Sequence, residues 1–161
     1  MRGPSVHSAK ALDAAWQVAG QILFGDESIV ELTSFVSLAV FLYHTEDCER
    51  ALDYFQQALR VQEKVLGKAH PDTLRTIMEM AILYGEGLGE RVREEEMYRL
   101  VLDGFEKSLG KDLKDTKRCA YNLAVLFFQG APSKEKLRSI ITEYPHLLQQ
   151  GIVHFRNFII N

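Results

Sequence analysis

The chain has 161 residues, of which 47% are hydrophobic and 25% are charged, values typical of soluble globular domains. This much apolar surface can offset the conformational entropy lost on folding, so disorder over most of the chain is excluded. With 19 basic and 22 acidic residues the formal charge is only −3, which argues against nucleic acid or an anionic membrane as the partner.

The cysteines and the apolar stretches indicate the cellular compartment of the protein. Cys48 and Cys119 are too few for a disulfide framework and are expected to be buried small apolar residues in a reducing environment. Residues 1–10 lack the apolar core of a signal peptide. The richest apolar stretch, residues 35–43, is shorter than the roughly 20 residues that span a bilayer. We therefore expect a cytoplasmic protein.

The chain is predicted to be all-α, because apolar residues recur at the three-and-four spacing of one helix face. Ser28 begins a capping box, Pro71 suits a first helical position, and Ser133 can cap a further helix. Gly67 and Gly110 follow apolar helix ends, where glycine accepts the left-handed conformation. These signals predict helices over residues 7–23, 29–44, 48–66, 71–86, 90–109, 114–129, 133–143 and 147–160.

An internal repeat runs through these helices. Gly25, Gly67 and Gly110 end equivalent segments and stand 42 and 43 residues apart. A repeat of this length made of two helices indicates a solenoid. The same spacing relates three pairs on the first helix of each unit, Leu38-Ala39, Met80-Ala81 and Leu123-Ala124.

The repeat length alone also fits HEAT and armadillo repeats, so the residues at the helix-packing positions are needed to identify the class of repeat. Small residues at Ala39, Ala51 and Ala58 let two helices approach closely, while Phe55 fills the space between them. This spacing resembles the tetratricopeptide signature, and residues 51–73 are similar to the long repeats of the kinesin light chain family.

The resemblance runs from Glu31 to Gly130 with declining quality, and it implies a non-catalytic scaffold that binds a protein or peptide partner. The expected fold is a right-handed α-solenoid of antiparallel helix hairpins, with about three tetratricopeptide-type units plus terminal helices. Within one domain, 1–161, we expect a partial leading unit at 7–25, units at 29–67, 71–110 and 114–143, and a C-terminal helix at 146–161.

Some positions depart from the family pattern. Glu94 occupies the place that Ala51 holds in the first unit, which is expected to weaken close packing there. The resemblance implies asparagine pairs that hold the backbone of cargo peptides, and of these only Asn122 is present. The heptad coiled coil that joins kinesin light chains to the motor is absent from the sequence, so motor attachment is not expected.

The first helices of stacked pairs line the concave face of a solenoid, where a partner is expected. Arg75 and Arg118 occupy equivalent places and could hold acidic side chains or a carboxylate, although surface arginines are usually solvated. Tyr43, Tyr121 and Phe128 are either apolar anchors for the partner or core residues. The predicted face comprises Thr33, Val36, Ser37, Val40, Tyr43, His44, Arg75, Met78, Glu79, Ile82, Arg118, Tyr121, Asn122, Val125 and Phe128.

The apolar segment 146–161 is unusual, because terminal helices of solenoids normally have a polar outer face. It could fill the groove of its own molecule, dock on a second copy, or mark where a longer protein was cut. The leading hypothesis is an adaptor that recognises a peptide or helix. The alternative is a self-assembly module that forms a homodimer through this segment.

Catalysis, metals and cofactors are not expected. The group from His44 to Glu49 lacks the spacing of a zinc site, and capping by Thr45 or Asp47 explains it more simply. No phosphate-binding loop or nucleophile elbow is present. The run of alternating charges is expected to be a solvated helix with ion pairs three and four residues apart, formed by Arg91, Arg93, Glu94, Glu95, Glu96 and Arg99.

Overall fold

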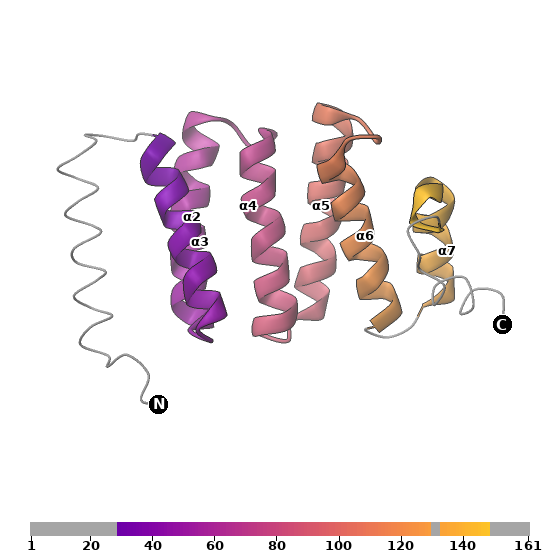
Figure 1. Ribbon diagram of the computed structural model, residues 1–161, viewed down its shortest axis with the longest axis horizontal. Coiled ribbons are helices and arrows are strands. Elements are labelled where there is room, and N and C mark those ends of the chain that lie inside the picture. Colours follow the sequence, from indigo (N-terminus) through magenta and orange to yellow (C-terminus); the bar gives the residue numbers. More distant parts are fainter. Residues whose placement is uncertain (1–28, 130–132, 149–161) are drawn as a thin grey trace.

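The computed structural model describes residues 29–129 and 133–148, and in this part of the chain the helices stand side by side as antiparallel hairpins (Figure 1). Each helix packs on the next along the chain, first within a hairpin and then between hairpins. The predicted all-α solenoid is therefore confirmed. The elements are α2 (Ile29–His44), α3 (Cys48–Val65), α4 (Pro71–Ile82), η1 (Leu83–Gly87), α5 (Arg91–Leu109), α6 (Lys114–Gln129), α7 (Lys134–Glu143) and η2 (Pro145–Leu148).

The predicted helix over 7–23 and the leading unit at 7–25 lie outside the described residues, as do Ser28 and most of the segment 146–161. Residues 145–148 form the short 3-10 helix η2, where a longer helix from 147 is predicted. No helix in the described ranges combines the length and the apolar character needed to cross a membrane.

The predicted helix boundaries follow from capping. Asp47 accepts a hydrogen bond from the Arg50 backbone amide at 3.4 Å, and Ser133 accepts one from the Lys136 amide at 3.3 Å. Pro71 stands at the start of α4, as predicted. The expected left-handed conformation is present at Gly67 and Gly110, whose φ angles are 92° and 87°.

A buried threonine fixes each turn between hairpins. The Thr73 hydroxyl donates to the Gly67 carbonyl at 2.9 Å, and the Thr116 hydroxyl donates to the Gly110 carbonyl at 2.7 Å. Both threonines are fully buried, so these hydrogen bonds satisfy polar groups that burial would otherwise penalise. The same joint therefore recurs 43 residues later, in register with the sequence repeat.

Small residues bring the paired helices close together, as the sequence predicts. Phe55 fills the space between them and is almost completely buried. Cys119 is buried, and burial raises the pKa of its thiol to about 12, so it is unreactive at neutral pH. The expectation that Cys48 is buried is wrong, because it is only half-buried at the start of α3. The fully buried alanines are Ala39, Ala51, Ala58, Ala81, Ala120 and Ala124.

One predicted helix, 71–86, differs in its last turn, where α4 passes into the π-helix η1. The Leu88 amide donates to the Leu83 carbonyl at 3.0 Å, across five residues. The interval from Ala81 to Glu94 is one residue longer than the interval from Ala39 to Ala51. A π turn absorbs one extra residue, so the longer interval is accommodated while the following helix keeps its register.

Overfilling the close contact on α3 should destabilise the domain. Ala58 is fully buried, so Ala58→Trp should lower the free energy of unfolding by on the order of 1–3 kcal/mol or more. Urea unfolding followed by circular dichroism measures the change. Arg60→Trp, at an exposed position of the same helix, is the control and should change the stability by less than about 0.5 kcal/mol. Equal effects of the two substitutions would contradict this packing.

Candidate functional site

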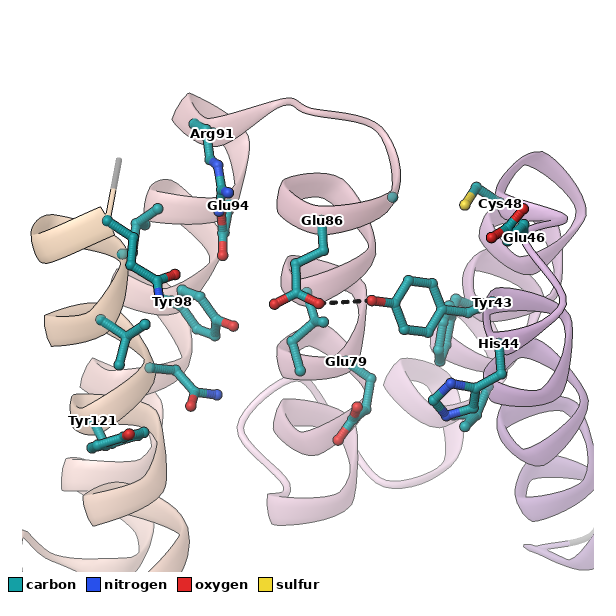
Figure 2. Close-up of a pocket in the computed structure, with 18 residues that line it drawn as sticks. Tyr43, His44, Glu46, Cys48, Glu79, Glu86, Arg91, Glu94, Tyr98 and Tyr121 are labelled. Carbon is teal, nitrogen blue, oxygen red and sulfur yellow. Dashed lines mark hydrogen bonds and ion pairs between the residues drawn. The ribbon is translucent and has the colours of Figure 1, made fainter. Parts of the chain in front are cut away.

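A groove of about 870 Å³ lies between the first helices of the three hairpins (Figure 2). Its walls come from α2, from α4 with η1, and from α6. Second helices contribute its floor, where Phe55 of α3 and Tyr98 of α5 lie. The groove therefore lies on the face where the sequence predicts a partner.

Eight of the predicted residues line this groove, three of them from α2, two from α4 and three from α6. Ser37, Arg75, Arg118 and Phe128 do not line it, and nor does Val36. The side chain of Thr33 lies outside the described residues. The eight are Val40, Tyr43, His44, Glu79, Ile82, Tyr121, Asn122 and Val125.

Met78 belongs to the core, so its predicted place on the binding face is wrong. Its side chain is 1% exposed and packs with residues of α4, α5 and α6. Phe128 is half-buried and packs against the same core. Tyr121, by contrast, is 40% exposed at the α6 wall, which leaves its ring available to a ligand.

The two predicted arginines lie beside carboxylates of the chain, Arg75 in close contact and Arg118 in a looser one. Arg75 of α4 donates to Asp115 at the start of α6, with Nη2 2.6 Å from Oδ2, and it also pairs with Asp72. Arg118 of α6 lies 3.8 Å from the Glu79 carboxylate on α4. Both pairs join neighbouring hairpins. The expectation that these guanidinium groups face an acidic partner is therefore corrected, because neither arginine lines the groove and Arg75 is already paired with Asp72 and Asp115.

Glu94 is buried, where a solvated residue is predicted. It is 5% exposed in α5, and its carboxylate lies against Gly85 of η1, where a Cβ would overlap Oε2 and Cδ. Arg91 donates to Oε2 at 2.8 Å. Burial is nevertheless the larger effect and raises the pKa of Glu94 above its ordinary value. The absence of a side chain at Gly85 thus admits an acid at a position that Ala51 fills in the first hairpin.

Tyr43 reaches across the groove from α2. Its hydroxyl donates to Oε2 of Glu86 at 2.9 Å, and this bridge links the α2 wall to the η1 wall (Figure 2). Desolvation, followed by the hydrogen bond to Glu86, raises the pKa of Tyr43 to about 12. The phenol therefore stays neutral at physiological pH and brings no charge of its own to the groove.

The charged residues that line the groove are mostly acidic. Among the described residues that line it, four are glutamates, and Arg91 is the single arginine or lysine. Sequence reasoning missed Glu86, Arg91 and Tyr98, because it considered only the first helix of each pair up to its last regular turn. The four glutamates are Glu46, Glu79, Glu86 and Glu94.

Stacked hairpins with a groove on their first helices are typical of a tetratricopeptide-type solenoid, and comparisons with known proteins support this repeat type. Residues 32–72 match the sequence model of the tetratricopeptide repeat. The crystal structure of BtubC (BKLC) from P. vanneervenii is similar, with a TM-score of 0.72 and 14% identity over 95% of this chain and 63% of that one. The present chain thus spans less than two thirds of the length of BtubC.

The crystal structure of TPR-like repeats from a Podosopora anserina protein, described as a kinesin light chain, is also similar to this chain. It has a TM-score of 0.69 and 19% identity over 94% of this chain and 72% of that chain, and a single-residue variant gives the same values. No curated protein matches the sequence significantly. The predicted resemblance to tetratricopeptide repeats of the kinesin light chain type is confirmed, and these structures share its fold.

The contact between Gly85 and Glu94 predicts that the effect of Gly85→Ala on stability depends on whether Glu94 is present. Gly85→Ala should lower the free energy of unfolding by about 1–3 kcal/mol, because the new methyl group overlaps the Glu94 carboxylate. In a Glu94→Ala background the same change should be neutral or stabilising by up to about 1 kcal/mol, since alanine favours helices. A thermodynamic cycle of the four proteins by urea unfolding measures both effects. The same destabilisation in both backgrounds would rule out this contact.

The burial of Glu94 also predicts a pH dependence. Because its pKa is raised in the folded state, stability is lost as the pH rises through that pKa and the buried carboxyl ionises. Glu94→Gln should therefore unfold at a higher temperature than the parent at pH 7, and the difference should shrink as the pH is lowered toward 4.5. Thermal unfolding at several pH values tests this, with Glu96→Gln at an exposed position as the control. A less stable Gln variant at pH 7 would mean that the Arg91 pair outweighs desolvation.

Proposed function

We propose that the protein is an interaction scaffold that binds a peptide segment of a partner protein in the groove between α2, α4 and α6. The observation that carries the proposal is a set of three apolar residues at equivalent positions of the three hairpins. Val40, Ile82 and Val125 stand 42 and 43 residues apart and all line the groove. A partner seated in the groove would therefore meet one apolar residue from each hairpin.

Polar and aromatic groups beside these residues suit a polypeptide ligand. Tyr43 and Tyr121 flank the apolar row, and large aromatic side chains contribute much of the energy of protein interfaces. Asn122 lines the same groove and could pair with a peptide backbone, as the resemblance to kinesin light chains implies. The tetratricopeptide fold supports a protein partner and a role without catalysis.

Replacing the central apolar residue should weaken binding of peptides. Peptides of 12 residues would be selected from a random display library on the immobilised full chain, and their Kd values measured by fluorescence anisotropy. Ile82→Gln keeps the side-chain length but removes the apolar surface, and should weaken binding by about tenfold, equivalent to about 1.4 kcal/mol. Circular dichroism would confirm that the variant remains folded.

Leu100→Gln is the matched control, because Leu100 is an exposed apolar residue of α5 that does not line the groove. It should leave the Kd within about twofold, in line with substitutions outside an interface. A library that yields no binding peptide, or peptides equally affected by both substitutions, would contradict the proposed function.

A further inference from the structure

We infer that the occupant of the groove is a basic peptide segment, whose arginine or lysine side chains contact Glu79 and Glu86 on either side of an apolar residue seated on Ile82. The inference rests on the proposed function and adds the chemistry of the ligand. It replaces the expectation of an acidic ligand, because neither Arg75 nor Arg118 lines the groove and Arg75 is already bound to Asp115.

Two carboxylates of the groove have no basic partner among the residues that the structure describes. Arg91 is engaged by Glu94 at 2.8 Å. Within residues 29–129 and 133–148, neither Glu46 nor Glu86 has a basic partner. The one hydrogen bond to Glu86 among these residues comes from the neutral Tyr43 hydroxyl, which leaves the negative charge in place. A cleft lined by one sign of charge concentrates its field and attracts ligands of the opposite sign.

Glu79 forms only a loose ion pair, with Arg118. Arg118 approaches its Oε1 atom to 3.8 Å, beyond the 2.7–2.9 Å of a charge-assisted hydrogen bond. Both side chains are partly exposed, so water screens the pair and its net contribution is small. A guanidinium or ammonium group of a ligand can therefore approach the Glu79 carboxylate more closely than Arg118 does.

The spacing on α4 and η1 defines the pattern of the ligand. Ile82 follows Glu79 by three positions, and Glu86 follows Glu79 by seven. All three lie on one face, with the apolar residue between the two acids. Two helical turns separate Glu79 from Glu86, a distance of about 10 Å along the axis. An extended peptide rises about 3.4 Å per residue and alternates its side chains, so the residues that face the groove are two positions apart. The apolar residue on Ile82 should therefore have a basic residue two positions before it and another two positions after it, and their long side chains cover the remaining offset to the two acids.

Aromatic rings add a preference for arginine. The hydrogen bond from Tyr43 holds the Glu86 carboxylate in place, and the Tyr121 ring is exposed at the opposite wall. Guanidinium groups bind carboxylates through two parallel hydrogen bonds and also stack on aromatic faces, whereas ammonium groups do not form this planar contact. We therefore expect arginine to be selected more often than lysine.

The test uses the same 12-residue display library, selected on the parent chain and on the Glu79→Gln/Glu86→Gln variant. Peptides from the parent should contain two basic residues about four positions apart with an apolar residue midway between them. Their Kd should rise by about tenfold on the double variant, and the affinity for the parent should fall as salt is raised from 50 to 300 mM. Glutamine keeps the shape of both side chains and removes only the charge.

Glu96→Gln/Glu135→Gln is the matched control, because it removes two exposed glutamates that do not line the groove. It should change the Kd by less than about twofold, as expected for screened charges at a distance. If the selected peptides are uncharged or acidic but bind the Ile82→Gln variant more weakly than the parent, the basic preference is wrong and the proposed function stands. Basic peptides that bind the double variant as tightly as the parent would also overturn the inference. Peptides indifferent to Ile82→Gln would overturn both proposals.

Discussion

The structure depends on the close approach of paired helices at small residues. Ala39 of α2 and Ala51 of α3 are fully buried in one hydrophobic cluster, where neither extends beyond a methyl group and larger residues such as Phe55 fill the remaining space. This contact fixes how near the helices of a hairpin lie, and the resulting positions of α2, α4 and α6 set the width of the groove. The binding face is therefore a consequence of core packing rather than of a separate loop insertion.

Much of the fold can be predicted from the sequence, because the signals are local and repeated. Capping by Ser133, the proline at the start of α4 and the two glycines after α3 and α5 each act within a few residues of the boundary that they mark. The π turn is different. It depends on one additional residue between Ala81 and Glu94, and on Gly85 meeting a carboxylate from the next helix. No local propensity reports a contact of that kind.

The candidate site is predicted only in part, for a related reason. Repeat register identifies which positions of a first helix are equivalent, and this brought Val40, Ile82 and Val125 onto one face. Equivalence does not reveal what lies opposite a side chain. Arg75 looks like a free cation in the sequence, yet Asp115 from the following hairpin lies within 2.6 Å of it. The charge that a ligand meets is what remains after such pairs form, and it can be assessed only once the helices are placed.

The threonine joints have a consequence for how such a chain folds. Each hydrogen bond joins residues only six apart, Thr73 with Gly67 and Thr116 with Gly110, so the direction of every new hairpin is encoded in a short peptide beside it. Contacts that are near in sequence cost little loop-closure entropy, and proteins rich in them fold quickly. Assembly can thus start at any hairpin and extend toward either end, without waiting for distant segments to meet.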